Sequence, residues 1–315
     1  MVDESARPLV SVVTPVFNGE AFLEECIASV IGQTYRHWEY VVVNNCSTDK
    51  SLEVATTLAA GDPRIRIHNN QEFLGATDNA NHALLLISPQ SKYCKMLHAD
   101  DWLFPTCLEE MVAVAESHPK VGLVGSYRIR DTEVRPNGLH PEVAVIPGRD
   151  VCRMNLLDGP HTFGTPSAHL FRSEIVKGRV PFYDEDHIAE DVDACYDIMR
   201  DWDFGFAHQI LVFQRVHDDS ITSKHARFEP QYADGLYMLD KYAPYFLTED
   251  ERRSAEDRLL KGYYRTLGRE LLVGKRRREF FSYHRAAFRR NNRRIRWPTV
   301  LAGAVRFGVK KLLGR

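Results

Sequence analysis

Leu9-Val-Ser-Val-Val-Thr-Pro-Val-Phe17 is rich in β-branched residues and nearly continuous in apolar ones, the pattern of a strand buried on both faces of a sheet. Asn18 comes next and is of a type that caps helices. Phe22, Cys26 and Val30 then follow the i, i+4 spacing of one helix face. The chain is therefore predicted to pass from a buried strand directly into an amphipathic helix.

The alternation of strand and helix continues from there. Further strands are predicted at 38–43, 65–68 and 93–97. Between them, one helix ends near Gly61-Asp-Pro63 and another covers about 76–87, while Pro105 lies in the first turn of a later one. This order predicts an α/β fold, a doubly wound and mostly parallel sheet with helices on both faces.

Three of the predicted strands run straight into polar loops, at 14–18, 44–49 and 98–101. In open parallel sheets, ligands bind beyond the carboxyl ends of the strands. We therefore expect these loops to converge and to form a binding site.

The adjacent carboxylates Asp100 and Asp101 are the candidate chemistry of that site. Neither a G-x-G-x-x-G nor a P-loop motif follows any strand, so a bound diphosphate needs another counter-charge. Two carboxylates at a strand end suit Mg²⁺ or Mn²⁺, which can bridge phosphates. The alternative is an Asp pair that only stabilises the dipole of the following helix.

Composition indicates an ordinary globular protein, with 44% hydrophobic and 27% charged residues. No apolar run reaches membrane-spanning length, and the start of the chain lacks the layout of a signal peptide, so a cytoplasmic location is expected. The 6 cysteines show no zinc-type spacing and are expected to be reduced.

The C-terminal region differs from the rest in charge. Residues 275–315 hold 14 Lys or Arg and one Glu, a net +13, which leaves −15 on 1–274 out of the total of −2. From about residue 226 the sequence is compatible with helices and is interrupted by prolines. We expect a basic helical extension over 226–315.

The end of this extension can form an apolar helical stripe beside Arg306, Lys310 and Lys311: Trp297, Val300, Leu301, Ala304, Val305, Val309 and Leu312. This is the layout of a helix lying on an anionic membrane surface. A solvated basic helix, or one packed on a partner subunit, explains it equally well. Nucleic-acid binding is not expected, because no recognition module accompanies the arginines.

The first hundred residues resemble the family 2 glycosyltransferases of the GT-A fold. The resemblance rests on five ordered blocks: Ser11-Val-Val-Thr-Pro-Val-Phe-Asn-Gly-Glu20, Ser29-Val-Ile-Gly-Gln-Thr-Tyr35, Ser47-Thr-Asp-Lys-Ser51, Asn70-Gln-Glu-Phe-Leu-Gly75 and Leu97-His-Ala-Asp-Asp-Trp102. It extends more loosely to about residue 225 through Glu190-Asp-Val-Asp193 and Gln214-Arg-Val-His-Asp-Asp-Ser220. It implies a GT-A domain over 1–225, with a nucleotide-sugar half at about 8–102 and an acceptor half at about 103–225.

The resemblance also implies an activity, the inverting transfer of a sugar from a nucleoside diphosphate, a UDP-sugar first of all, to an acceptor hydroxyl. The expected pathway is cell-surface polysaccharide or glycolipid synthesis, with a carbohydrate or lipid-linked acceptor. Mn²⁺ or Mg²⁺ is the implied cofactor, held by Asp100, Asp101 and His217. The implied donor-binding residues are Thr14, Pro15, Phe17, Asn44, Asn45, His98 and Asp100.

Two positions depart from the family's pattern. Asn44 and Asn45 stand where relatives have Asp, and an amide donates as well as accepts, so base preference is less defined. His98 stands where the metal motif often begins with Asp. Its imidazole can bind Mn²⁺ or hydrogen-bond ribose or phosphate.

The resemblance makes Asp191 the catalytic base that takes the acceptor proton. The alternative for Asp191 and Glu190 is simple stabilisation of a helix N-terminus. The Gly164-Thr-Pro-Ser167 segment is expected to line the acceptor side with Thr165, Ser167 and Glu190, although a plain structural turn explains it almost as well. The rival functions are a nucleotide-sugar-binding protein without transferase activity, and a nucleotidyltransferase, whose glycine-rich phosphate loop is missing.

Overall fold

The structure is a computed structural model that describes residues 7–135, 139–157, 162–184, 189–217, 220–274 and 277–312. Contacts between residues divide the chain into two compact units. The first comprises Met1–Asn155 and Pro160–Val216, and the second comprises Leu156–Gly159 and His217–Arg315. Each unit is considered by itself below.

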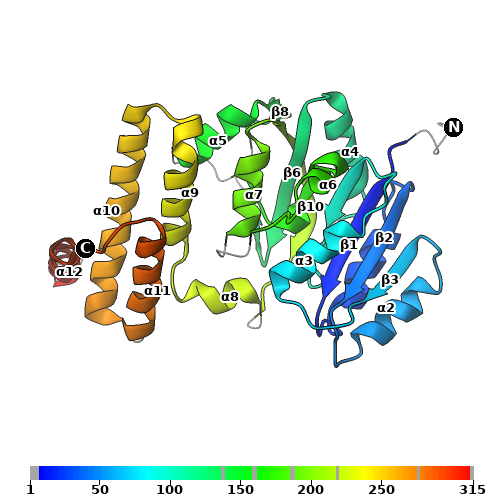
Figure 1. The fold of residues 1–315 in the computed structure, drawn as a ribbon, viewed down its shortest axis with the longest axis horizontal. Helices are drawn as coiled ribbons and strands as arrows, with labels where there is room; N and C mark the ends of the chain where they lie inside the picture. Colours follow the sequence, from blue (N-terminus) through cyan, green and yellow to red (C-terminus); the bar gives the residue numbers. More distant parts are fainter. Residues whose placement is uncertain are drawn as a thin grey trace. The chain divides into compact units, whose positions relative to one another are not determined.

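The first unit is built on a mixed sheet of 10 strands (Figure 1), whose main path runs β3-β2-β1-β4-β9-β6-β10-β5. The strands before residue 98 are parallel: β1 (Val10–Val16), β2 (Trp38–Asn44), β3 (Ile65–Asn69) and β4 (Tyr93–Met96). The second half adds β5 (Trp102–Leu103), β6 (Val121–Arg130), β9 (His169–Arg172) and β10 (Asp203–Gln214). Short strands β7 (Glu133–Arg135) and β8 (Val145–Ile146) pair with β6 and β10.

The predicted α/β alternation is confirmed, with helices between the strands: α1 (Leu23–Ile31), α2 (Ser51–Ala59), α3 (Ala76–Leu85), α4 (Cys107–Ser117), α5 (Gly148–Leu156), α6 (Ser173–Gly178) and α7 (Glu190–Ile198). A 3₁₀ turn, η2 (Pro166–Ala168), leads into β9. β9 is antiparallel to both of its neighbours, β4 and β6, so the sheet is mixed where the donor half meets the rest.

The strand residues alternate between two packed faces. Val10, Val12 and Val16 of β1 join one apolar core with α1, α2 and α4, while Val13 is buried outside that core. Thr14 lies two residues after Val12, so its side chain points to the same face of the sheet and into the same core. All six cysteines are free thiols, and of these Cys46 is the one that is not fully buried.

Two local predictions were wrong. Asn18 does not cap α1, which begins after Phe22; Asn18 adopts a left-handed backbone (φ 51°) and its side chain accepts a hydrogen bond from Thr48 N at 2.8 Å. Pro105 lies in the turn before α4, which starts at Cys107. Asn18 thus joins the loop of Thr48 instead of capping the helix.

The second unit is helical, as expected for the C-terminal region, with α8 (Ile221–Ala226), α9 (Gln231–Phe246), α10 (Glu249–Val273), α11 (Arg277–Arg290) and α12 (Trp297–Leu312). A capping box of Thr248 and Glu251 starts α10. Tyr263, Leu267, Phe288 and Val300 belong to the apolar core of this unit.

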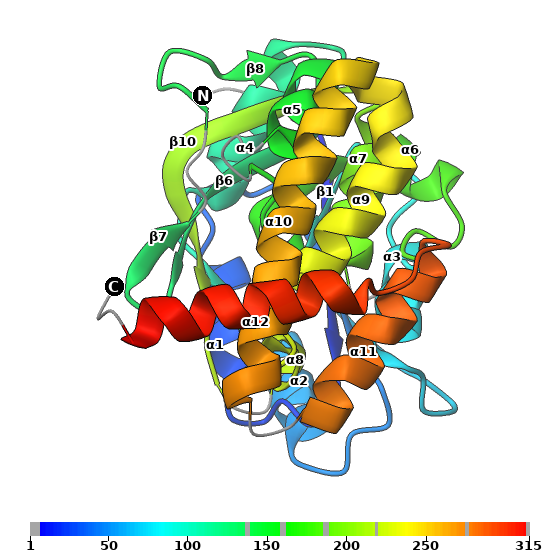
Figure 2. The same cartoon turned by 90° about the vertical axis from the view of Figure 1, so that its left-hand side faces the viewer.

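Helix α12 crosses α10 at two glycines (Figure 2). A Cβ atom added at Gly268 would lie 2.5 Å from Ala304 N, and one added at Gly303 would lie 2.7 Å from Tyr264 O. Only glycine therefore allows the two backbones to approach this closely. Among the described helices, none combines the length and the apolar composition that crossing a bilayer requires.

Candidate functional site

The polar loops after β1, β2 and β4 meet, as the sequence predicts. Ser51 Oγ accepts a hydrogen bond from Gly19 N at 2.8 Å, and Asp49 accepts one from Glu20 N at 3.0 Å. Cys26 on α1 donates through Sγ to the carbonyl of His98 at 3.5 Å. Side-chain contacts thus fix the three loops against one another and against α1.

His98, Asp100 and Asp101 form a cluster in which one ligand atom of each residue lies within 4.8 Å of the others. Asp101 is buried, and its Oδ1 accepts a hydrogen bond from Arg215 N at 3.0 Å. Its Oδ2 is also buried and has no hydrogen-bond partner among the described residues, although the nearby Ser167 side chain favours the ionised carboxyl. A buried carboxylate oxygen without a partner is costly, and coordination of a cation would satisfy it, so these residues fit a divalent metal.

Burial raises the pKa of the Asp101 carboxyl above its ordinary value, while the nearby His98 lowers it. The neighbouring Asp100 raises it further. A cation at the cluster would remove both penalties, because it stabilises the ionised form of each carboxylate.

Arg215, directly after β10, ties the cluster to the rest of the sheet. Its Nε donates to the carbonyl of Asp100 at 3.1 Å and its guanidinium pairs with Glu25 on α1. The same guanidinium lies 4.6 Å from the centre of the Phe22 ring. Arg215 therefore holds the loop through the backbone carbonyl of Asp100 and the Oδ1 atom of Asp101.

Ser167 lies beneath the loop that carries His98, Asp100 and Asp101, and its side chain is not on the surface. It is fully buried, its Oγ accepts a hydrogen bond from His98 N at 3.1 Å, and its carbonyl accepts one from Lys95 Nζ at 2.5 Å. Thr165 is also buried, and its carbonyl accepts a bond from Ala168 N at 2.8 Å. Both side chains are thus part of the buried η2 turn that supports His98, and their contact with an acceptor stays a prediction.

Phe17 and Phe73 stand out as an exposed aromatic pair. Their side chains are 49% and 59% exposed, and their ring centres are 4.9 Å apart in an edge-to-face arrangement. Phe17 follows β1 as predicted, whereas Phe73 was not singled out from the sequence. Its position within the Asn70-Gln-Glu-Phe-Leu-Gly75 block was the one available signal. Exposed rings are suited to stacking on a planar base.

The other residues expected at the nucleoside are placed less openly. Thr14 Oγ1 is buried 2.8 Å from Tyr40 Oη, because strand alternation turns the side chain into the core. Pro15 is partly exposed.

Asn44 and Asn45 use their amides to shape the neighbouring loops. Asn45 Nδ2 donates to the carbonyl of Leu74 at 2.8 Å, and its Oδ1 accepts from Leu74 N at 2.9 Å. Asn44 Nδ2 donates to Asn69 Oδ1 at 3.2 Å. These buried amides hold the segment that presents Phe73, so their contribution to a base site is structural in this arrangement.

Asp191 lies in the first turn of α7, where its Oδ1 accepts a hydrogen bond from Val192 N at 2.8 Å. Burial raises the pKa of its carboxyl, and the charges of His98 and Arg128 lower it. His98 lowers the pKa of both Asp101 and Asp191, so its imidazole lies near both carboxyls. Glu190 reaches α3 instead, where its Oε1 accepts a hydrogen bond from Thr77 Oγ1 at 3.4 Å.

Arg128 on β6 is a cation of this site that the sequence did not reveal. Its Nε donates to Gln214 Oε1 at 2.8 Å, and Nη1 is buried without a partner among the described residues. Burial lowers the pKa of Arg128 to about 10, against the opposing effects of Asp101 and Asp191. A Cβ atom at Gly164 would lie 2.9 Å from Nη1, so the glycine makes room for the guanidinium.

The metal-binding role expected of His217 stays a prediction. This residue is the first after Val216 and belongs to the second unit. The nitrogen donor in the cluster is His98, at the position where the sequence comparison noted a missing Asp.

Comparison with known proteins adds to this geometry. Residues 11–179, a little over half of the chain, match the family model described as Glycosyl transferase family 2. TuaG of Bacillus subtilis (strain 168), a putative teichuronic acid biosynthesis glycosyltransferase, is 36% identical over 95 residues, 30% of this chain and 37% of TuaG. The chain thus matches about a third of the length of such curated relatives.

Two solved structures share the fold. TarS 1–349 of S. aureus in complex with UDP superposes with a TM-score of 0.61 at 17% identity, covering 84% of this chain and 75% of that one. The mannosyltransferase PcManGT from Pyrobaculum calidifontis, in complex with GDP-Man and Mn²⁺, gives a TM-score of 0.58 at 18% identity, covering 99% and 89%.

Proposed function

Because the chain belongs to glycosyl transferase family 2, we propose that it transfers a sugar from a nucleoside diphosphate to an acceptor hydroxyl, with inversion at the anomeric carbon. The observation that carries this proposal is the buried Asp101 Oδ2, which lacks a partner among the described residues and lies in a cluster with His98 and Asp100. A site that leaves a carboxylate oxygen in this state is built for a ligand that brings positive charge.

The cofactor in this proposal is Mn²⁺ or Mg²⁺, with His98, Asp100 and Asp101 as its protein ligands. When bound, the cation would neutralise negative charge that develops on the departing diphosphate. A nitrogen ligand favours Mn²⁺, because Mg²⁺ prefers oxygen donors. PcManGT, which shares the fold, is known in complex with Mn²⁺.

The donor's base stacks against Phe17 and Phe73, and the preferred donor is a UDP-sugar. Support comes from the exposure of both rings, and from TarS, which was solved with UDP. Because the Asn44 and Asn45 amides are hydrogen-bonded to the loops, stacking supplies more of the base affinity than side-chain hydrogen bonds do.

Asp191 is the catalytic base of the proposed reaction. As the acceptor oxygen bonds to the anomeric carbon, the bond from that carbon to the diphosphate breaks and the acceptor proton passes to the Asp191 carboxylate. The raised pKa of Asp191 makes it a stronger base than an exposed carboxylate. The positive charge of Arg128 lowers the pKa of Asp191 and so partly offsets the effect of burial, which favours the ionised base.

The acceptor is a carbohydrate or a lipid-linked sugar of cell-surface polysaccharide or glycolipid synthesis, and the site of action is the cytoplasm. The relative TuaG, whose name refers to teichuronic acid, supports this class of pathway.

The test is a screen of nucleotide sugars by thermal shift with and without Mn²⁺, followed by measurement of nucleoside diphosphate release with candidate acceptors. If the chain is a transferase, binding of one donor should raise the melting temperature of the protein, and nucleoside diphosphate should be released when the acceptor is present. Donor binding without release by any acceptor would favour the alternative, a nucleotide-sugar-binding protein without transferase activity.

A further inference from the structure

The turn between α11 and α12 encloses a hollow of about 630 Å³ in the second unit. Its wall carries Arg285, Arg289 and Arg294, and its apolar lining includes Phe288, Ile295 and Trp297. Arg285 and Arg289 are four residues apart on α11 and so project from one face of that helix. The combination of several guanidinium groups with apolar walls suits a phosphate that is attached to an apolar body.

The backbone of this turn is fixed before any ligand arrives. Asn292 has a left-handed backbone (φ 53°) and its N–H donates to the carbonyl of Arg289 at 2.9 Å, while Arg293 N donates to the carbonyl of Phe288 at 2.8 Å. These two bonds form a Schellman motif, which ends α11 and reverses the chain.

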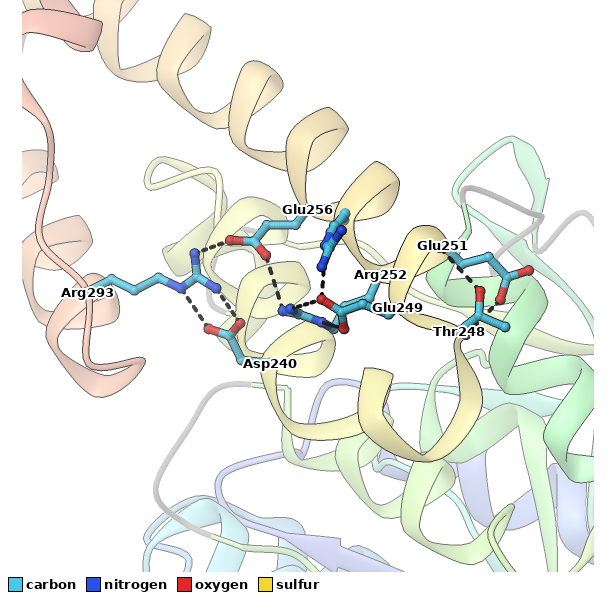
Figure 3. Close-up of polar contacts among 8 residues, drawn as sticks. Asp240, Thr248, Glu249, Glu251, Arg252, Glu256 and Arg293 are labelled. Atoms are coloured by element: carbon cyan, nitrogen blue, oxygen red, sulfur yellow. Dashed lines mark hydrogen bonds and ion pairs between the residues drawn. The ribbon is translucent and has the colours of Figure 1, made fainter.

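Arg293 anchors the same turn to the helices behind it (Figure 3). Its Nη2 and Nε bind the two oxygens of Asp240 on α9 at 2.6 and 3.0 Å, and its Nη1 binds Glu256 on α10 at 2.5 Å. A bidentate pair of this kind fixes the arginine geometrically. The charge of Arg293 is therefore neutralised by Asp240 and Glu256 within the unit.

The other three arginines of the hollow keep their charge available. Arg285, Arg289 and Arg294 are exposed, and no carboxylate of the described chain lies within ion-pair distance of them. Arg285 makes one further contact, from Nε to the carbonyl of Phe281 at 3.0 Å. Three unpaired cations around one hollow favour an anionic ligand there.

An exposed apolar stripe on α12 continues from the edge of the hollow. Trp297, Leu301 and Val305 recur every fourth residue and are 44%, 54% and 65% exposed. The broader stripe expected from the sequence was wrong for Val300 and Ala304, which are buried. The side chains of Val309 and Leu312 lie outside the described residues. What remains outward is a narrow stripe with exposed Arg296 and Arg306 beside it.

We propose that this hollow binds the headgroup phosphate of an anionic phospholipid and that the stripe of Trp297, Leu301 and Val305 rests in the membrane interface above it. A lipid is the occupant that uses both features, because free phosphate leaves the stripe in water and a nucleic acid base could stack on Trp297 but would leave Leu301 and Val305 in water. The site is separate from the donor site, so its occupancy does not depend on sugar transfer.

The full chain is tested by sedimentation with vesicles of phosphatidylcholine alone and of phosphatidylcholine mixed with phosphatidylglycerol. Binding to the mixed vesicles is expected to exceed binding to the neutral ones. The double change Arg285→Gln/Arg289→Gln is expected to weaken it on the order of tenfold or more, since each basic group near an anionic surface contributes about fivefold.

The matched control is Arg278→Gln/Arg290→Gln, which removes the same charge from α11 at exposed positions outside the hollow. It is expected to weaken binding by less than Arg285→Gln/Arg289→Gln does, because these two side chains do not line the hollow. Equal losses in the two double variants would overturn the pocket in favour of diffuse attraction to the basic region. Equal binding of the native chain to both kinds of vesicle would overturn the anionic requirement.

A third arm separates lipid from soluble phosphate. The melting temperature is measured with inorganic phosphate. If phosphate raises it while the chain does not pellet with the mixed vesicles, the lipid assignment is overturned. Tryptophan fluorescence provides the structural readout, because Trp297 should shift to shorter wavelength on vesicle binding and Trp297→Phe should abolish that shift. Melting curves and donor binding of each variant show that it is folded, and they report on the proposed function separately.

Discussion

Asp191 is the residue whose removal separates catalysis from stability. Burial raises its pKa, so between the ordinary value of 3.8 and the raised value the folded chain binds more protons than the unfolded chain. Stability contributed by this group is therefore lost as pH rises through that window, and at neutral pH the ionised carboxylate is a cost.

Asp191→Asn is accordingly expected to reduce sugar transfer by about 10²–10⁴, the usual share of a general base, while leaving the melting temperature unchanged or higher. The measurement is turnover at saturating donor beside a thermal melt at the same pH. Undiminished turnover would remove Asp191 from the mechanism, and a large fall in melting temperature would make its role structural.

The same raised pKa predicts the pH profile of the reaction. Since the base must be ionised, kcat/KM should rise with pH along a limb whose midpoint lies above 3.8. Asp101 also titrates in a raised range, but a bound cation competes with its proton. Saturating Mn²⁺ should therefore shift the part of the kcat/KM profile that depends on Asp101 to lower pH, while the part that depends on Asp191 stays where it is. A limb that disappears entirely with Mn²⁺ would assign it to the metal site.

Phe73 tests the proposed stacking of the base. Phe73→Ala should raise KM for the donor by roughly 5- to 100-fold with little change in kcat, because stacking on an aromatic ring contributes about 1–3 kcal/mol. Leu85→Ala is the control, since Leu85 on α3 is as exposed as Phe73. Equal effects of the two substitutions on KM would argue against a base at Phe73.

At the residue scale, sequence pattern and resemblance located Asp100, Asp101, Asp191 and Phe17 but could not give their surroundings. Arg128 and Gly164 come from different loops and strands, and their contact depends on a strand register that no local pattern encodes. The burial of Thr14 could have been predicted, because Thr14 and Val12 are two residues apart in one strand and point to the same face.

At the scale of elements, the parallel half of the sheet was predictable because its signal is local. A nearly continuous apolar run predicted β1, and the i, i+4 spacing of apolar residues predicted α1. β9 was not predicted, since four residues, His169–Arg172, carry too short a pattern, and insertion between β4 and β6 depends on contacts distant in sequence.

The crossing of α10 and α12 gives a prediction at the same scale. Gly268→Ala would place a Cβ atom 2.5 Å from the backbone nitrogen of Ala304, so the helices must separate, at an expected cost of roughly 1–3 kcal/mol in the free energy of unfolding. Gly308→Ala on α12 meets nothing nearer than 3.7 Å and should stabilise the helix by up to about 1 kcal/mol. Urea unfolding measures both, and similar values would mean that the crossing is loose.

At the scale of the whole molecule, two units with separate apolar cores predict two unfolding transitions. Donor with Mn²⁺ should raise only the transition of the first unit, by mass action on its folded state. Gly268→Ala should lower only the midpoint temperature of the transition of the second unit. Differential scanning calorimetry resolves the two, and a single transition that moves with both perturbations would show one cooperative body.

The distribution of thiols offers an experimental handle on these events. Five of the six cysteines are buried, and burial raises the pKa of Cys26 and of Cys94 to about 12, which suppresses their reactivity. Cys46 is partly open, and its Sγ lies 3.4 Å from the carbonyl of Asn70, in the segment that leads to Phe73. A maleimide dye should thus attach at one position of the native, unmutated chain. Its emission would report the arrival and departure of the donor in real time.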